Sequence, residues 1–440
     1  MLRGKTCGYI CGILIFLSIM LTYQVQGTLL PPEKHLVSVG QPLNIKFPAP
    51  LEKGLKMEII NNESDALQEN VIEGDFIAGS NPVALHPGQL KLRLSLYGVV
   101  PVRDMLVSVS PEIKVVPGGQ SIGVLIHARG IIVADTYDVV NQNEQRINPA
   151  AQAGIQKGDV ILKIDGLEVG SDSQFRDFVY RTGAAGESMA VEVKRGEETF
   201  STTLNPVLCK ETSDYRVGLM LRDSAAGVGT ITFYEPDSKS YGALGHIITD
   251  VNTKHPVDLQ DGKIVGASVQ GIAKGKRGQP GEKIGILQGD KLLSGTINRN
   301  TRLGIFGNLQ KPLENPVFTE PIPVAMTSQI HEGPAEILTV LSGDTVEKFS
   351  VEILKINPLV RQDGKALVLK ITDERLLAQT GGIIQGMSGS PIIQEERLVG
   401  AVTHVFVNDP TRGYGVSAEW MLEESGLLDD SGQIIKEPAA

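Results

Sequence analysis

Alternating apolar and polar residues recur along most of this chain and predict half-buried β-strands. Two clear runs with a period of two lie at residues 43–47 and 90–96, each close to prolines. Helical spacing is rarer, and Phe175, Phe178 and Val179 are its clearest example. With 49 glycines and only 5% aromatic residues, the composition also suits tight turns between short strands. The sequence therefore predicts a mainly β fold.

The first segment has a different pattern. Arg3 and Lys5 precede an uncharged, mainly apolar stretch at residues 9–21, and no further charge occurs before Glu33. A basic flank followed by a short apolar stretch is typical of segments that direct export. Residues 1–27 are therefore predicted to be either an uncleaved membrane anchor or a signal peptide.

The remaining chain is long enough for several domains. At 440 residues it exceeds one ordinary domain. Residues 28–110 form a small β-rich region that is rich in proline and carries no cluster of chemically active side chains, which predicts a spacer or docking role. Residues 111–205 and 206–440 carry more specific motifs and are treated as two further domains.

Charge and cysteine content exclude several classes of protein. The 51 acidic and 41 basic residues give a formal net charge of −10, which opposes nonspecific binding to nucleic acids. Cys7 and Cys11 lie in the N-terminal segment, and Cys209 has no obvious partner. The zinc-peptidase motif His-Glu-x-x-His is missing from the sequence. No metal or other cofactor is predicted.

A motif series in residues 111–205 resembles a PDZ domain. Asn-Pro-Ala-Ala-Gln-Ala-Gly-Ile at 148–155 is followed by Lys-Gly-Asp-Val-Ile-Leu-Lys-Ile-Asp-Gly at 157–166. The resemblance implies that this domain binds peptide ends. The predicted contacts are backbone N–H groups of the loop formed by Ser121, Ile122 and Gly123.

The groove of such a domain needs a helix beside a strand. Phe175, Phe178 and Val179 predict that helix within residues 172–181. The same three residues also fit plain core packing, and both interpretations stay open at this point.

Gly386-Met387-Ser388-Gly389-Ser390-Pro391 resembles the nucleophile loop of chymotrypsin-like serine peptidases. Glycines allow the backbone to turn tightly, so that the N–H groups of Gly386 and Ser388 can point at the oxyanion formed when Ser388 attacks a carbonyl. Ser390 replaces the second glycine of the commonest motif. A simple Gly/Ser turn between strands is the alternative.

A serine nucleophile requires a base, and His246 is the predicted one. It follows small and apolar residues early in the last domain, where chymotrypsin-like peptidases carry their catalytic histidine. An ordinary structural imidazole is the alternative for this position. His404 lies on the strand after the nucleophile and is expected to line the substrate cleft.

Asp373 is the predicted acid that orients the base, because it preserves the chain order His, Asp, Ser. It lies unusually close before the nucleophile, so a helix-capping role is the alternative. Asp250, Asp290 and Asp344 therefore remain candidates for the same function.

The expected substrate pocket contains Gly382, Thr403, His404 and Tyr414. The position of Gly382, a few residues before the nucleophile, corresponds to the pocket floor in chymotrypsin-like enzymes. Without a carboxylate there, a Lys or Arg side chain would lose its hydration and gain no ion pair. Uncharged small or aliphatic residues are therefore expected at the cleaved position.

Leu244-Gly245-His246, together with residues 380–391 and 401–410, resembles the stage IV sporulation protein B family, over about residues 111–422. The resemblance implies a PDZ domain before a chymotrypsin-like double β-barrel, and secretion from the forespore into the intermembrane space, with membrane anchoring until processing. It also implies self-cleavage and cleavage of a membrane-bound regulator, so that an intramembrane protease can activate pro-sigma-K. The PDZ groove would hold peptide C-termini or a part of the chain itself.

A second function explains the same order of domains. A non-catalytic PDZ scaffold at the membrane would bind peptides, and its C-terminal domain would be purely structural.

Overall fold

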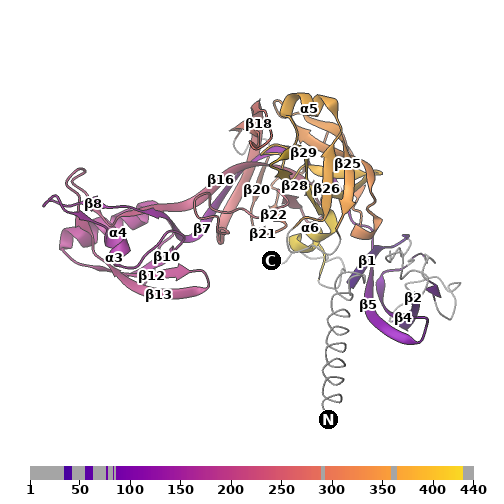
Figure 1. The fold of residues 1–440 in the computed structure, drawn as a ribbon, viewed down its shortest axis with the longest axis horizontal. Coiled ribbons are helices and arrows are strands. Elements are labelled where there is room, and N and C mark those ends of the chain that lie inside the picture. Colours follow the sequence, from indigo (N-terminus) through magenta and orange to yellow (C-terminus); the bar gives the residue numbers. More distant parts are fainter. Residues whose placement is uncertain are drawn as a thin grey trace, which may run out of the picture.

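The computed structural model describes residues 34–41, 55–62, 76–77, 83, 86–288, 293–357 and 364–429 (Figure 1). The predicted export segment at residues 1–27 and the candidate acid Asp290 lie outside the described residues. No helix in the described ranges is long and apolar enough to cross a membrane.

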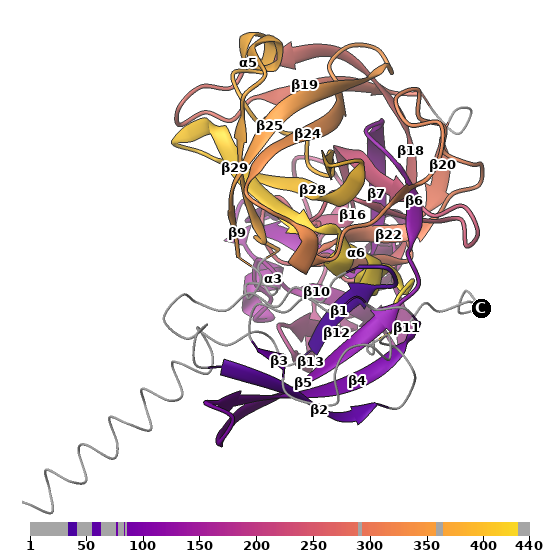
Figure 2. The same ribbon diagram turned by 90° about the vertical axis from the view of Figure 1, so that its right-hand side faces the viewer.

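In the described residues, the first region is a small five-stranded sheet. The alternating run at residues 90–96 lies on one of its strands, whereas the run at residues 43–47 lies outside the described residues. Its core consists of residues that alternate along the strands, such as Leu90, Leu92 and Leu94 on one strand and Met105 and Val107 on the next. Figure 1 shows this sheet far from the PDZ-like part, which contains residues 139–216. In the view of Figure 2 the sheet lies in front and the PDZ-like part behind it. The strand order is β1 (Lys34–Ser38), β5 (Val100–Ser110), β4 (Gly88–Leu96), β2 (Leu55–Asn62), β3 (Phe76–Ile77).

The PDZ-like part contains the predicted helix as α4 (Asp172–Ala185). Ser171 caps its first turn, and Gly186 ends it with a φ of 71°. Phe175 and Val179 are buried in the core, which confirms core packing for these two residues. The other elements are β8 (Val139–Val140), β9 (Arg146–Ile147), α3 (Pro149–Gln152), β10 (Val160–Ile164), β11 (Leu167–Glu168), β12 (Met189–Arg195), β13 (Glu198–Leu204), β14 (Val207–Leu208) and β15 (Tyr215–Arg216).

Two long strands connect the PDZ-like part to the peptidase region that follows it in the chain. These are β7 (Ser121–Thr136) and β16 (Leu219–Tyr234), which are antiparallel partners over most of their length. Residues 131–132 of β7 pair with β10 in the PDZ-like part, whereas residues 122–128 pair with β18 (Leu259–Ala273). The predicted domains 111–205 and 206–440 therefore share two strands. Figure 1 shows both strands running from one part to the other.

A curved sheet, called here the upstream sheet, precedes the nucleophile in the chain. It contains residues 121–128 of β7 and 224–234 of β16, and its core includes Ile122, Ile231 and Tyr241. A bridge between Gly295 and Leu309 brings its two ends together. Its other strands are β6 (Lys114–Pro117), β17 (Ser240–Ala243), β18, β19 (Glu282–Leu287), β20 (Ser294–Thr296), β21 (Arg299–Thr301), β22 (Gly304–Asn308) and β23 (Ile322–Pro323).

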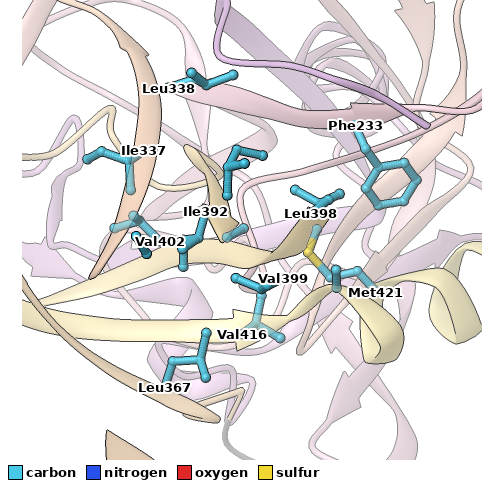
Figure 3. Packing of buried hydrophobic residues seen from close by; sticks show 14 of the residues in the cluster. Phe233, Ile337, Leu338, Leu367, Ile392, Leu398, Val399, Val402, Val416 and Met421 are labelled. Atoms are coloured by element: carbon cyan, nitrogen blue, oxygen red, sulfur yellow. The ribbon is translucent and has the colours of Figure 1, made fainter. Parts of the chain in front are cut away.

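Six strands after the upstream sheet form a closed barrel. Ile337, Leu367, Ile392, Leu398 and Val416 from different strands meet in its core (Figure 3). The strand order is β24 (Gly333–Val340), β25 (Val346–Ile356), β26 (Leu367–Ile371), β29 (Asp409–Ser417), β28 (Arg397–Phe406) and β27 (Pro391–Gln394). The helical elements of this region are η2 (Thr327–Gln329), α5 (Glu374–Thr380) and α6 (Ala418–Ser425). The predicted mainly β fold with a barrel around the nucleophile loop is thus confirmed, and one of the two predicted barrels is closed.

Truncation of Leu398 tests this core. The side chain has no exposed surface, so Leu398→Ala should lower the free energy of unfolding of the barrel by about 2–5 kcal/mol, measured by urea unfolding. Leu167→Ala is the matched control, because Leu167 is 60% exposed and should change stability by less than about 0.5 kcal/mol. Equal effects of the two changes would contradict the packing described here.

Candidate active site

The nucleophile loop has the tight backbone that the glycine spacing predicts. Gly386 and Gly389 have φ values of 90° and 93°, which residues with a Cβ rarely adopt. A side chain at position 389 would also collide with the carbonyl oxygen of Thr230. The two glycines are therefore required both by conformation and, at position 389, by space.

Strand β16 holds the loop from one side through two buried threonines. Thr230 Oγ1 donates to the carbonyl oxygen of Gly386 at 2.7 Å, and Thr232 Oγ1 donates to that of Gly389 at 2.8 Å. The backbone N–H of Thr230 donates to the carbonyl oxygen of Ser388 at 2.9 Å. We call these three hydrogen bonds the threonine clamp. The clamp satisfies three carbonyl groups of the loop, those of Gly386, Ser388 and Gly389, and fixes the side of the loop that faces away from solvent.

The opposite face of the loop keeps two free donors. Among the described residues, neither the N–H of Gly386 nor that of Ser388 has a hydrogen-bond acceptor, although Gly386 is buried. The neighbouring N–H groups of Met387 and Gly389 donate to Ile384 and Val402. A buried N–H without an acceptor is rare, so this pair is well suited to an oxyanion.

His246 follows β17 through a turn in which Leu244 and Gly245 have φ values of 67° and 71°. Its Nδ1–H donates to the carbonyl oxygen of Ile247 at 3.0 Å, which leaves Nε2 free to accept a proton. Burial lowers the pKa of His246 below the ordinary imidazole value, and the hydrogen bond to Ile247 partly opposes this effect. The ring is therefore neutral, as a general base must be, at pH 7.

His404 lies next to this base. The two imidazole rings have centroids 5.1 Å apart. Desolvation lowers the pKa of His404, and the repulsion that its charged form would experience from Lys365 and from a protonated His246 lowers it further. Two adjacent histidines with lowered pKa values cannot both charge easily, which favours the neutral form of His246.

The Ser388 hydroxyl donates to the carbonyl oxygen of Thr403 at 2.8 Å. Thr403 directly precedes His404 in the chain, so the hydroxyl lies beside the histidine pair. No hydrogen bond joins Ser388 to His246 in the described structure. A rotation about the Ser388 side chain is needed before His246 can take its proton, as is common before substrate binds.

Asp373 does not orient the base in this structure. Its carboxylate caps α5, accepting from the N–H of Leu376 at 2.9 Å and from that of Ser350 at 3.4 Å. Asp is a preferred residue at this capping position, and both of its oxygens are engaged there. No hydrogen bond joins Asp373 to His246 in the described structure, so the triad role stays a prediction.

Of the other candidates, Asp250 and Asp344 are described, and neither forms a hydrogen bond with His246. Asp250 is buried and accepts from the N–H groups of Asn252 and Thr253 within its own turn, whereas Asp344 is exposed. Across the described residues, the Ile247 carbonyl is the group that receives the Nδ1–H. A backbone acceptor leaves no sequence motif, so sequence reasoning missed it.

The predicted pocket residues surround the serine only in part. Thr403 and His404 contact Ser388 and His246 as described, and the Tyr414 ring packs against Phe406 at 4.6 Å. Gly382 has a φ of 137° and packs against the carbonyl oxygen of Pro410. Its glycine is thus explained by loop packing, and its role as a pocket floor stays a prediction.

The predicted PDZ loop at Ser121, Ile122 and Gly123 lies in the upstream sheet. All three residues are buried in β7; Ile122 and Gly123 pair with β16 on one side and with β18 on the other. These strand edges are occupied, so the structure contradicts peptide binding at this position. The loop was implied by the PDZ resemblance, whereas residues 121–136 form one continuous strand.

Another edge in the PDZ-like part has the required features. Residues 219–222 of β16 pair with β7 on one side, and the described residues provide no strand on the other side. Helix α4 lies close to this part of the chain: the N–H of Asp172 donates to Asp223, and Tyr215 packs against Gly183. Phe178 and Leu221 are half-buried beside the same core. A strand edge beside a helix is the geometry by which PDZ domains add a peptide strand.

Comparison with known proteins matches two regions of the chain to family models. The family model described as SpoIVB peptidase S55 matches residues 213–422, and the PDZ domain model matches residues 104–205. The serine protease Do-like HtrB of Bacillus subtilis (strain 168) is 37% identical over 68 residues, which are 16% of this chain and 14% of that protein. A protein of Clostridium perfringens (strain 13 / Type A) named as a zinc metalloprotease is 36% identical over 72 residues, 16% of this chain and 21% of its own. The chain thus spans about a fifth or less of each relative.

Solved structures with partial similarity include a PDZ domain and a protease. The PDZ domain of an SdrC-like protein from Listeria monocytogenes has 21% identity and a TM-score of 0.17, covering 22% of this chain and 90% of that domain. The active form of the Rv3671c protease of M. tuberculosis has 14% identity and a TM-score of 0.27, covering 46% of this chain and 75% of that one.

The capping role of Asp373 makes a prediction that differs from a triad role. Asp373→Asn should retain peptidase activity within about threefold, because Asn caps helices as well as Asp does. A triad aspartate changed in this way would lose on the order of 10⁴-fold in kcat. Asp373→Ala should lower stability by about 0.5–2 kcal/mol, measured by thermal unfolding. A severe loss of kcat in Asp373→Asn with unchanged stability would show that Asp373 is the triad acid.

Proposed function

Because the chain carries a PDZ domain and a SpoIVB S55 peptidase region, we propose that it is an exported serine endopeptidase of sporulation signalling, with Ser388 as nucleophile. The two family models confirm the SpoIVB-like PDZ serine peptidase recognised in the sequence. The observation that carries the proposed activity is the nucleophile loop, where Ser388 lies between two unpaired N–H groups and a histidine pair.

The geometry supports acyl transfer through a covalent intermediate. Ser388 Oγ forms a bond to the scissile carbonyl carbon while its proton passes to Nε2 of His246. The carbonyl oxygen becomes negative and accepts from the N–H groups of Gly386 and Ser388. His246 then gives the proton to the leaving amine as the C–N bond breaks, and water hydrolyses the acyl-enzyme by the same route. The Ile247 carbonyl keeps the imidazole in the required tautomer throughout.

The proposed substrates are the chain itself and a membrane-bound regulator of an intramembrane protease. Cleavage of that regulator would release the protease to activate pro-sigma-K. This part rests on the resemblance to the sporulation family, and the apolar stretch at residues 9–21 supports export from the forespore into the intermembrane space. Membrane anchoring until processing is part of the same proposal. The lack of a carboxylate at Gly382 supports cleavage after uncharged residues.

The PDZ-like part is proposed to bind a peptide end along residues 219–222 of β16, beside α4. The same strand continues to Thr230 and Thr232 of the threonine clamp. A peptide that binds one conformation of β16 more tightly than another would therefore shift the nucleophile loop toward the conformation that accompanies it. A cavity of about 580 Å³ between the PDZ-like part and the upstream sheet supports this coupling, because Gly158, Lys194, Ile247 and His255 line it together.

Labelling with a fluorophosphonate probe tests the proposed activity. The probe should modify Ser388 in the purified full chain, identified by mass spectrometry, and Ser388→Ala should remove the signal. His246→Ala should slow labelling on the order of 10³-fold, because the base is lost. His331→Ala is the control, since His331 is an exposed loop residue next to Glu395. Absence of labelling in a folded protein would favour the non-catalytic PDZ scaffold.

A charge placed beside the PDZ edge tests the peptide site. Phe178→Glu should abolish self-cleavage and processing of the regulator in cells, while labelling of Ser388 by the small probe stays within about twofold. Arg176→Gln is the control on the same helix, because Arg176 is exposed and its ion pair is with Asp172 of the same helix. Normal processing by Phe178→Glu would remove the peptide-binding proposal and leave the peptidase proposal intact.

A further inference from the structure

Of the lysines and arginines in the described structure, only Lys283 is buried, with 5% of its surface exposed. Its Nζ donates to Thr339 Oγ1 at 2.7 Å and lies 3.5 Å from Ser121 Oγ. Within the described residues, no carboxylate oxygen lies within 4.0 Å of this amine. Burial without a counter-ion lowers the pKa of Lys283 to about 7.

The amine connects the two halves of the peptidase region. Lys283 lies on β19, which pairs with β18 of the upstream sheet. Thr339 lies on β24 of the closed barrel, and Ser121 is the first residue of β7. The three side chains therefore meet where the upstream sheet and the closed barrel pack together.

The stem of the same side chain supports the nucleophile loop. The N–H of Lys283 donates to the carbonyl oxygen of Gln385 at 2.9 Å, directly before Gly386. A Cβ placed on Gly386 would lie only 3.1 Å from Cβ and Cδ of Lys283. Gly386 therefore packs against the aliphatic part of the Lys283 side chain. This contact fixes the position of the Gly386 N–H, which is one of the two predicted oxyanion donors.

We propose that Lys283 is a positioning residue for the Gly386 and Ser388 N–H pair, and that it holds the pair in place only while its amine is uncharged. The inference rests on the proposed peptidase function. An ammonium group at this position would need water or a counter-ion, and its neutral partners Thr339 and Ser121 supply neither. Protonation from solvent would therefore separate the two halves and displace Gly386.

The charged groups on the surrounding elements do not replace the missing counter-ion. Glu282 precedes Lys283 in the chain and is exposed, and Glu336 on β24 pairs with Lys348. On the remaining strands, β18 carries Asp261 and Lys263, and β7 carries His127, Arg129 and Asp135. None of these forms an ion pair with Lys283, so its protonation is governed by burial.

The pH dependence of probe labelling tests the role. In the wild-type chain, the labelling rate of Ser388 should fall about tenfold per pH unit below about pH 7. Lys283→Met keeps the stem against Gly386 but removes the titrating amine. Its labelling should persist to lower pH, until His246 takes a proton at a pH below 6.5. Lys283→Arg, which stays charged, should label on the order of 10²-fold more slowly than wild type at pH 8.

The outcomes separate this inference from the proposed function. Lys263→Met, an exposed change on β18, should reproduce the wild-type pH profile. If Lys283→Met also has that profile, or if Lys283→Arg labels at the wild-type rate, the positioning role is wrong while the peptidase remains. If no variant labels at any pH, the proposed function itself fails.

Unfolding gives a second readout that does not depend on catalysis. The folded pKa of about 7 lies below the ordinary lysine value of 10.5, so between these values the unfolded chain binds more protons than the native chain. Relative to Lys283→Met, the wild-type unfolding equilibrium should therefore shift toward the native state as the pH rises from 7 to 10.5, by up to tenfold per pH unit. A constant difference between the two proteins over this range would show that the amine is not buried as described, and would overturn the inference.

Discussion

The threonine clamp is the interaction on which the candidate active site depends. Thr230 and Thr232 satisfy carbonyl groups of Gly386 and Gly389, whose φ values are unfavourable for other residues. Because both hydroxyls are buried, the loss of either would leave a buried carbonyl without a donor, which costs about 1–3 kcal/mol. The nucleophile is thus presented by the closed barrel but held in shape by the upstream sheet.

Because the closed barrel carries the nucleophile and the upstream sheet fixes its loop, these two halves are joined by polar contacts as well as by apolar packing. Apolar side chains tolerate small shifts, whereas hydrogen bonds between buried groups specify one register. Phe233, next to Thr232, packs into the barrel core with Leu398 and Met421 (Figure 3). The core of the barrel therefore anchors β16, and β16 in turn fixes the loop.

The sequence predicted the parts of the site that depend on local chemistry. Gly386, Ser388 and His246 were found because tight turns need glycine and acyl transfer needs a serine and a base. Chain order does not distinguish a helix cap from a triad acid, and in this structure both carboxylate oxygens of Asp373 accept from backbone N–H groups. The Ile247 carbonyl and the buried environment of Lys283 depend on tertiary packing, which no local pattern encodes. Residues 121–123 were predicted to form a loop, but they are the first residues of β7. The length of β7 depends on its pairing with β16 and β18, and a local pattern cannot show this because both strands lie far downstream in the sequence.

The placement of the PDZ-like part between β7 and β16 also has a consequence for how the chain folds. During synthesis, residues 121–128 emerge long before their partners in β16, so a direct pairing would have to close a long loop of disordered chain. The PDZ-like part contains its own core and lies wholly between these two segments. Once it has folded, the last residues of β7 and the first residues of β16 are already paired. The pairing can then extend residue by residue along both strands into the upstream sheet. The inserted domain therefore acts as a template that lowers the entropic cost of assembling the upstream sheet around it.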